Sequence, residues 1–399
     1  MTDTNPEKIN EILTRGVQEV IVKEDLKKKL LSGKKIKLYL GVDPTGFDLH
    51  LGHAIPLWKL RSFQEMGHEV VLLIGDFTAR IGDPSGKDAT RKPLTEKEVK
   101  ANMKDYKKQA SKILDFSKVK IEYNNKWLSK LNFQDVLKLA SQFTVQQMIQ
   151  RDMFQRRISD NLPISLQEFM YPLMQGYDSV AMDVDLEVGG NDQMFNMLAG
   201  RTLQKNYNNK DKDVMTLRLL LGNDGRKMSK TFNNFIALDD KPSDMYGKVM
   251  SIKDELINDY FELATRLPAS EVEEIKKMPN PRDQKARLAF EIVKMYHGEK
   301  EAQKAEEEFD RVHKNRELPT EMPVFETDKR EYFLPDLLCD TGLAPSKNEA
   351  KRLVEAGAVK ISIKGQVLSV KEWKQNIKLE DEMVLQVGNR KFVKISFRK

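Results

Sequence analysis

The order of elements predicted between residues 34 and 87 restricts the fold more than any other feature of the chain. KKIKLYLGV (34–42) has the composition of a strand, and a helix is predicted from about Gly52 to Met66, closed by Gly67. HEVVLLIGD (68–76) is a short β-branched run typical of a buried strand, and the glycine-rich run IGDPSGK (81–87) follows it. This order predicts an α/β fold with a Rossmann-like, doubly wound parallel sheet whose ligand binds at the carboxyl ends of the strands.

The whole sequence divides into four predicted parts. Residues 1–240 form the Rossmann-like catalytic domain, with a helix pair expected in 1–33 because NEILTRGVQEVIV (10–22) has apolar residues at helical spacing. Residues 241–315 are helical and highly charged. Residues 316–331 contain two prolines and no clear period, which is typical of a linker. Residues 332–399 form a small α+β domain, with a helix capped by Ser346 and ended by Gly357 before short strands.

Composition restricts the cellular setting. The single cysteine, Cys339, excludes an internal disulfide and thiolate metal clusters, and it suits a reducing cytoplasm. No apolar run approaches the ~18 residues of a membrane span, and the polar N-terminus does not resemble a signal peptide. We therefore expect a cytoplasmic protein with no membrane association. Residues 332–399 hold 13 Lys and Arg against 8 Asp and Glu, a net charge of +5, which fits an ordinary basic domain or an RNA-binding surface.

Two of the five histidines lie three positions apart in HLGH (50–53). His50 and His53 could be metal ligands, but no cysteine and no third histidine lies near them in the sequence. The pair falls at a predicted helix start, where backbone N–H groups and the helix dipole favour an anion, and Gly52 permits a close backbone approach. The motif therefore favours the phosphates of a nucleoside triphosphate.

The second motif is KMSKT (227–231), which lies on a glycine-flanked run. Lys227 and Lys230 could belong to a solvated basic turn. About 175 residues after HLGH, in a chain of alternating strands and helices, two ammonium groups instead suit a departing pyrophosphate.

HLGH followed by KMSKT resembles the paired signature of class I aminoacyl-tRNA synthetases. The runs YLGVDPTGFDLHLGH, IGDPSGK, YPLMQGYD and GGNDQ, spread with KMSKT over 39–231, resemble bacterial tyrosyl-tRNA synthetases in order and spacing. Residues 332–399 resemble the S4-type RNA-binding domain that ends this family, and 241–315 would be the helical domain for the anticodon region of tRNA. The resemblance implies ATP-dependent attachment of L-tyrosine to tRNA(Tyr) through tyrosyl-adenylate, by a ligase that acts as a homodimer.

The resemblance also implies a tyrosine site. Tyr39 and Asp178 would contact the phenolic hydroxyl, which both donates and accepts a hydrogen bond. Tyr39 alone could equally be a half-buried strand residue, but together with Asp178 it favours a hydroxyl-reading pocket. The ammonium group of the substrate would contact Asp83, Tyr171 and Gln175. Its carboxylate would contact Gln193.

The nucleotide site is implied in the same way. Gly41 and Asp43 would line the adenosine, Thr45 and His50 the phosphates, and His53 the ribose. Asp192 would contact the ribose while Gly190 gives the backbone access. The pyrophosphate would meet the KMSKT residues, including Met228, and two basic loop residues: Lys87 and Arg91. ATP is a substrate accompanied by Mg²⁺, and neither a protein metal site nor a tightly bound cofactor is expected.

Alternatives remain at this stage. A tryptophanyl-type synthetase shares the fold, a small-molecule nucleotidyltransferase would explain HLGH, and an RNA-binding factor descended from a synthetase could keep the fold without catalysis. Glu187 departs from the pattern, since a glutamine is often found there, and this leaves the contacts around it open. Residues 143–161 are helical with an apolar face that suits either a subunit interface or the core.

Overall fold

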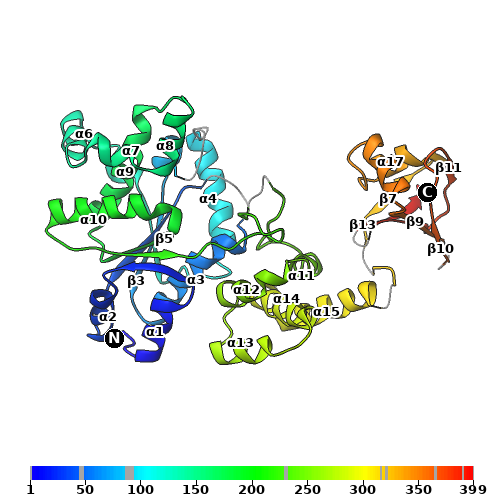
Figure 1. The fold of residues 1–399 in the computed structure, drawn as a ribbon, viewed down its shortest axis with the longest axis horizontal. Helices are drawn as coiled ribbons and strands as arrows, with labels where there is room; N and C mark the ends of the chain where they lie inside the picture. Colours follow the sequence, from blue (N-terminus) through cyan, green and yellow to red (C-terminus); the bar gives the residue numbers. More distant parts are fainter. Residues whose placement is uncertain are drawn as a thin grey trace. The chain divides into compact units, whose positions relative to one another are not determined.

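The chain forms two compact units, Met1–Ala302 and Gln303–Lys399 (Figure 1). The structure is a computed structural model, and it describes residues 2–44, 49–85, 94–228, 232–314, 317–319, 322–363, 366–388 and 391–398.

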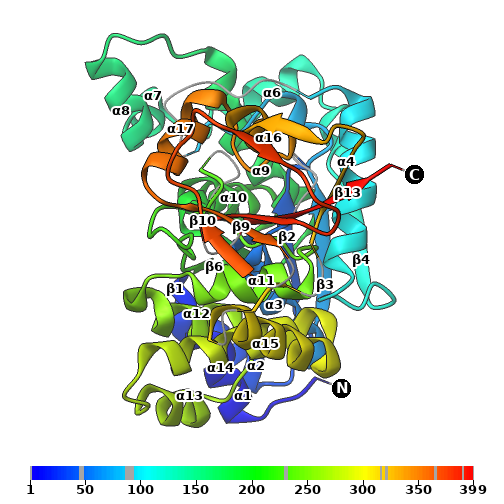
Figure 2. The same ribbon diagram turned by 90° about the vertical axis from the view of Figure 1, so that its right-hand side faces the viewer.

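The first unit is built on a six-stranded sheet in the order β1-β6-β5-β2-β3-β4 (Figure 1, Figure 2). β2 pairs in parallel with β3 and β5, β3 with β4, and β5 with β6, whereas β1 runs antiparallel to β6. The predicted α/β fold with a parallel sheet is confirmed. The strands are β1 Val17–Ile21, β2 Lys37–Val42, β3 Glu69–Ile74, β4 Val119–Tyr123, β5 Leu186–Gly190 and β6 Asp213–Leu217.

Helices connect and surround these strands (Figure 1). The helix predicted after HLGH is α3, Leu51–Glu65, with His50 at its N-cap. α9 and α10 approach closely through two glycines, because a Cβ on Gly176 would lie 3.1 Å from the backbone nitrogen of Gly200. Besides α3, the helices in this region are α1 Pro6–Thr14, α2 Lys23–Leu31, α4 Glu96–Ala110, α5 Asn125–Leu128, α6 Phe133–Ala140, α7 Val145–Ile149, α8 Asp152–Ser159, α9 Leu166–Met182 and α10 Met194–Asn208.

The helix pair predicted for residues 1–33 is confirmed as α1 and α2, but the helical spacing that was extended through residue 22 is wrong. α1 ends at Thr14, and Gly16 follows with φ of +64°, a left-handed conformation that stops a helix. The next residues, 17–21, form β1 against β6. β-branched residues in this stretch and an open sheet edge outweigh the apolar spacing that suggested a helix.

A buried lysine ties α3 to the N-terminal segment. The Lys59 side chain is 8% exposed, and its Nζ donates to the carbonyl oxygens of Ile12 and Arg15 at 2.7 and 2.8 Å. Burial lowers the pKa of Lys59 to about 7, because desolvation disfavours its charged form and Arg15 adds a like charge.

Residues 242–297 add helices that pack onto this sheet region. The Arg15 guanidinium donates to the carbonyl oxygens of Leu267 and Thr265 at 2.7 and 2.8 Å, and Trp58 of α3 donates to the Tyr296 hydroxyl at 3.1 Å. These helices are α11 Pro242–Met250, α12 Ile257–Ala264, α13 Ala269–Lys276 and α14 Pro281–His297, and α15 Glu299–His313 follows. Among the described residues no helix is both long and apolar enough to cross a membrane.

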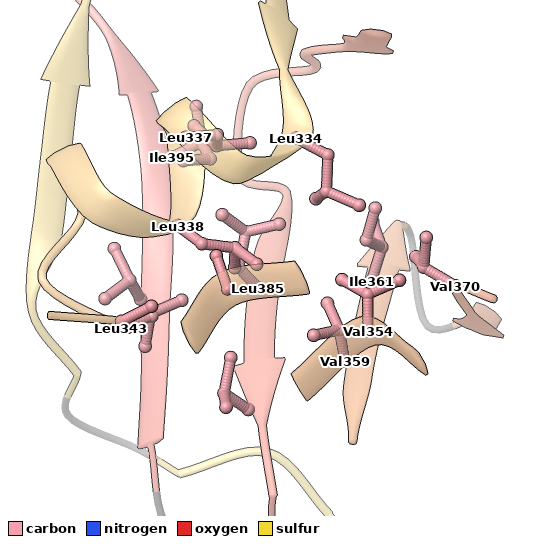
Figure 3. Packing of buried hydrophobic residues seen from close by; sticks show 14 of the residues in the cluster. Leu334, Leu337, Leu338, Leu343, Val354, Val359, Ile361, Val370, Leu385 and Ile395 are labelled. Carbon is pink, nitrogen blue, oxygen red and sulfur yellow. The ribbon is translucent and has the colours of Figure 1, made fainter. Parts of the chain in front are cut away.

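The second unit has its own core between two helices and a five-stranded sheet of order β10-β9-β12-β13-β7 (Figure 3). Leu334 and Leu338 of α16 and Val354 of α17 pack against Leu385 and Ile395 of the sheet. β7 pairs in parallel with β13, so part of the segment predicted as a linker belongs to this sheet. The elements are α16 Leu334–Asp340, α17 Lys347–Glu355, β7 Val324–Thr327, β9 Val359–Ile363, β10 Gln366–Ser369, β12 Val384–Val387 and β13 Lys391–Phe397, with β8 Glu331–Phe333 paired to β11 Asn376–Lys378.

Candidate active site

The residues expected to bind substrate gather at the carboxyl ends of three neighbouring strands. Tyr39, Gly41 and Asp43 lie on or just after β2. Gly190 ends β5, and Asp83 follows β3. Because β5, β2 and β3 are consecutive in the sheet, segments far apart in the sequence meet at one edge.

Asp178 of α9 is held by two side chains from the end of β4. Trp127 Nε1 donates to Asp178 Oδ1 at 2.7 Å, and Asn124 Nδ2 donates to Oδ2 at 3.2 Å. The carboxylate is 2% exposed, and burial, with the charges of Glu187 and Asp43, raises its pKa well above the usual range. Asp178 is therefore a buried carboxyl group held in a fixed orientation by two donors.

Tyr39 reaches the same region from β2. Its ring is fully buried among Val71 and Met182, with Trp127 packed against that cluster. The Tyr39 hydroxyl lies 2.9 Å from the Ser179 Oγ, and Ser179 is the residue next to Asp178. Burial raises the pKa of Tyr39 well above its usual range, and the charges of Glu187 and Asp178 add to this, so the phenol stays protonated.

Asp43 is fixed by three neighbours. The hydroxyl of Tyr171 donates to Asp43 Oδ2, and the hydroxyl of Thr78 donates to Oδ1, both at 2.7 Å. A Cβ on Gly75 would lie 1.9 Å from Asp43 Oδ1, so only glycine leaves room at that position. Asp43, expected on the adenosine, and Tyr171, expected on the ammonium group, are thus in direct contact.

A set of amide side chains connects the expected ammonium and carboxylate ligands. Gln193 Nε2 donates to Asp83 Oδ2 at 2.8 Å, and Asn196 Nδ2 lies 3.0 Å from the side-chain oxygens of both Gln193 and Gln175. Gln175 Nε2 in turn donates to Glu187 Oε1 at 3.0 Å. The side-chain oxygen of Gln175 therefore faces Asn196, and its side-chain nitrogen faces Glu187.

Glu187 forms a buried ion pair that the sequence analysis did not predict. Lys212, just before β6, contacts Glu187 Oε2 and also donates to the Ser179 Oγ at 2.9 Å. The lysine side chain is fully buried and that of Glu187 is 2% exposed. Burial lowers the pKa of Lys212 in spite of the nearby carboxylate. The pair therefore contacts Gln175 directly through Glu187, and it is linked to Tyr39 through Ser179.

The two histidines meet at the start of α3. Their rings are stacked with centroids 3.7 Å apart, and the backbone N–H of His50 donates to His53 Nδ1 at 3.3 Å. A Cβ on Gly52 would lie 3.1 Å from the His50 ring. The backbone around His50 pairs with the segment after KMSKT, since the Leu51 N–H donates to the Ile236 carbonyl at 3.0 Å. The first signature motif is thus hydrogen-bonded to the segment that follows the second.

The described part of KMSKT also faces this edge. Lys227 Nζ lies 3.4 Å from Asp192 Oδ2, although 61% of the Lys227 side chain is exposed. Met228 is buried, close to the position that a Cβ on Gly52 would take. A Cβ on Gly190 would lie 2.7 Å from Asp192 Oδ1. Four of the expected residues lie outside the described part of the chain: Thr45, Lys87, Arg91 and Lys230.

Several residues of the pocket were missed by sequence reasoning. Asn124 and Trp127 follow β4, so their place after a parallel strand was the available signal. No motif includes Thr78, Ser179 or Lys212. Their side-chain contacts in the pocket are to residues at least 25 positions away in the sequence, so no local pattern reveals them.

Comparison with known proteins gives a consistent result. The family model described as tRNA synthetases class I (W and Y) matches residues 31–314, and the model of the tyrosine--tRNA ligase SYY-like C-terminal domain matches 315–395. A tyrosine--tRNA ligase of Thermotoga maritima is 48% identical over 397 residues, covering 98% of both chains. The Haemophilus influenzae ligase is 46% identical over 404 residues, covering 100% of this chain and 99% of its own.

Solved structures share the fold over about three quarters of the chain. A C-terminally truncated mitochondrial tyrosyl-tRNA synthetase of Coccidioides posadasii matches 76% of this chain and 90% of its own, with a TM-score of 0.61 and 25% identity. A tyrosyl-tRNA synthetase of Archaeoglobus fulgidus, complexed with L-tyrosine, matches 75% of this chain and 99% of its own, with a TM-score of 0.59 and 24% identity.

Proposed function

The chain belongs to the class I tRNA synthetases of the tryptophan and tyrosine type, and we propose that it attaches L-tyrosine to tRNA(Tyr) at the expense of ATP. Relatives that match it over nearly their whole length are named for this reaction. The observation that carries the choice of amino acid is the burial of Tyr39 and Asp178 close together, with the Tyr39 hydroxyl against the residue next to Asp178. A tryptophan side chain offers a donor but no acceptor there, whereas a phenol offers both.

Recognition of the hydroxyl follows from this chemistry. Asp178 would accept the hydrogen of the substrate phenol, and Tyr39 would donate to its oxygen. Phenylalanine has no hydroxyl to form either bond, so both groups would lose their hydrogen bond to the substrate, which costs binding free energy. Tyrosyl-tRNA synthetases are themselves the standard example of such discrimination.

The first step needs no general base, because the tyrosine carboxylate is a nucleophile at neutral pH. It attacks the α-phosphorus of ATP in line, the bond to the bridging oxygen breaks, and pyrophosphate leaves as tyrosyl-adenylate forms. Gln175 and Asp83 would orient the ammonium group and Gln193 the carboxylate, so the protein contributes chiefly by positioning and by stabilising charge. In the second step a terminal hydroxyl of the tRNA attacks the carbonyl carbon and AMP leaves.

Stabilisation of the phosphates would fall to the histidines and the basic loops. We propose that His50, Thr45, Lys227 and Lys230 bind the phosphates as charge moves onto pyrophosphate, with further contributions from Lys87 and Arg91. Mg²⁺ would arrive with ATP. Within the described ranges no group of three or more His, Cys, Asp or Glu side chains is arranged to hold a metal ion.

The tyrosine pocket is tested by Asp178→Ala in the tyrosine-dependent exchange of pyrophosphate with ATP. We expect kcat/KM for tyrosine to fall by about 10- to 100-fold, because removing the acceptor leaves the buried hydroxyl of the substrate unsatisfied, which costs about 1–3 kcal/mol. Asp185→Ala is the matched control, since Asp185 is also buried, at 8% exposed, but accepts from the Lys37 N–H at the other end of the strands. Equal losses in both variants would argue against the assignment of Asp178.

A homodimer is proposed from a run of exposed apolar side chains. Within the first unit, residues 133–166 expose six large apolar side chains: Phe133, Leu137, Val145, Ile158, Leu162 and Leu166. Leu166 is 82% and Phe133 77% exposed, and exposed apolar side chains that gather into one patch mark a protein–protein interface. The predicted interface, residues 143–161, lies inside this run.

Sedimentation equilibrium at micromolar concentration checks the dimer. We expect about twice the 46.1 kDa of one chain, and we expect Phe133→Asp with Leu166→Asp to give the single mass. A wild-type protein that sediments as one chain would refute the dimer.

RNA binding is assigned to the C-terminal unit. Lys347 and Arg352 of α17 have side chains 65% and 80% exposed, and Lys351 stacks on the Trp373 ring at 4.3 Å. Such a basic helix on an independently packed unit suits contacts to the phosphates of folded RNA. The reaction and the single cysteine also support the cytoplasmic location that we propose.

Neutralising this helix should separate tRNA charging from amino-acid activation. We expect the triple change of Lys347, Lys351 and Arg352 to Gln to leave pyrophosphate exchange unchanged while weakening tRNA binding. The slope of log affinity against log salt should become shallower by about 0.7–0.9 for each phosphate that the helix no longer neutralises. Glutamine at the three exposed lysines of α2, Lys23, Lys27 and Lys28, is the charge-matched control. An unchanged salt slope would remove the helix from the RNA surface.

A further inference from the structure

α4 holds the connection between β2 and α3 through two buried amide side chains. The Asn102 Nδ2 donates to the Pro44 carbonyl oxygen at 2.7 Å, and the Gln109 Oε1 accepts from the Leu49 N–H at 2.7 Å. The two amides are each 4% exposed, and they lie about two helical turns apart on one face of α4. The helix therefore contacts the chain both where it leaves β2 and where it enters α3.

The chemistry of the groups gives both hydrogen bonds a direction. A backbone N–H only donates and a proline carbonyl only accepts, so Gln109 must present its oxygen and Asn102 its nitrogen. Leu49 is 3% exposed and belongs to no helix or strand. A buried N–H outside regular secondary structure needs an acceptor from elsewhere in the fold, and the Gln109 side chain supplies it.

Leu49 is also held through its carbonyl group. The Leu49 carbonyl oxygen accepts from the Leu238 N–H at 2.8 Å, and the Leu238 carbonyl oxygen accepts from the Lys112 Nζ at 2.6 Å. Lys112, which follows α4, also pairs with Asp239 at 2.7 Å. The end of α4 thus contacts both the residue before HLGH and the segment after KMSKT.

His50 is the functional residue that these contacts place. It follows Leu49 directly, it is the N-cap of α3, and its backbone forms an antiparallel bridge with Ala237. Because both backbone groups of Leu49 are hydrogen-bonded, the point from which the His50 side chain extends is fixed. A misplacement of about 1 Å at a reacting group can cost about 100-fold in rate, even when the change that causes it is distant.

We propose that Gln109 and Asn102 are positioning residues that set His50 for the transition state of tyrosine activation. This inference rests on the proposed function, in which His50 binds the phosphates of ATP. The two amides contact the backbone on either side of the β2–α3 connection, whereas Asp178 of the tyrosine pocket is held by other side chains. Loss of either amide should therefore slow adenylate formation without weakening the binding of tyrosine.

Two variants and one control test the proposal in the full-length enzyme. Gln109→Met removes the acceptor and Asn102→Leu removes the donor, each at a similar side-chain volume. Gln204→Met is the matched control, because Gln204 is a fully buried glutamine whose Nε2 donates to a backbone carbonyl, that of Val184, at 2.5 Å. Val184 precedes the amino end of β5, at the opposite end of the strand from the site.

The measured quantities are the rate of tyrosyl-adenylate formation in a single turnover at saturating ATP, the dissociation constant of tyrosine and the midpoint of thermal unfolding. We expect the rate to fall roughly tenfold or more in Gln109→Met and in Asn102→Leu, with the dissociation constant of tyrosine within about twofold of wild type. In the control we expect a lower unfolding temperature but a rate within about twofold of wild type.

A second measurement shows whether the amides act through His50. With His50→Ala already present, we expect Gln109→Met and Asn102→Leu each to lower the rate by less than about threefold, because changes that act on one group are not additive. A purely structural role gives the same fold-loss in both backgrounds, or weakens tyrosine binding as much as it slows the reaction. Either result, or an unchanged rate in both variants, overturns the proposal.

The test does not depend on one variant. If Gln109→Met does not fold, Asn102→Leu decides by the same measurements. A wild-type enzyme that forms no tyrosyl-adenylate would overturn the proposed function instead, and the two failures are therefore distinct.

Discussion

Burial of charged side chains at the ends of parallel strands is the constraint on which the pocket depends. A buried carboxylate or ammonium group is costly unless hydrogen bonds and an opposite charge compensate it. Asp178 is therefore paired with Trp127 and Asn124, and Glu187 with Lys212 and Gln175. These pairings fix side chains from separate strands and helices in one arrangement before a substrate enters, which is the preorganisation that selective binding needs.

Sequence reasoning predicted the frame of the molecule better than the contacts inside it. The parallel sheet and α3 followed from local pattern, because the apolar periods and the glycine stops lie within short windows. β1 was missed because its strand character depends on pairing with β6, about 200 residues away. Glu187 departs from the family pattern, so the sequence marks its position. Its partner Lys212 lies just before β6, outside every motif, so the ion pair could not be predicted.

We propose that activation and RNA binding belong to different parts of the chain. The expected groups for activation lie in the unit Met1–Ala302, whereas the unit Gln303–Lys399 has its own core and an exposed basic helix. Because the second unit has its own core, we expect charge on α17 to be removable without loss of that unit's packing. The sheet of the second unit also includes β7, so its folded extent begins before residue 332.

The most direct test of the account is pyrophosphate exchange by the wild-type enzyme with each of the twenty amino acids in turn. The account predicts exchange that depends on tyrosine, with phenylalanine at least about a hundredfold poorer, because it lacks the hydroxyl that Tyr39 and Asp178 are arranged to bind. Preference for tryptophan, comparable exchange with phenylalanine, or no exchange with any amino acid would contradict it.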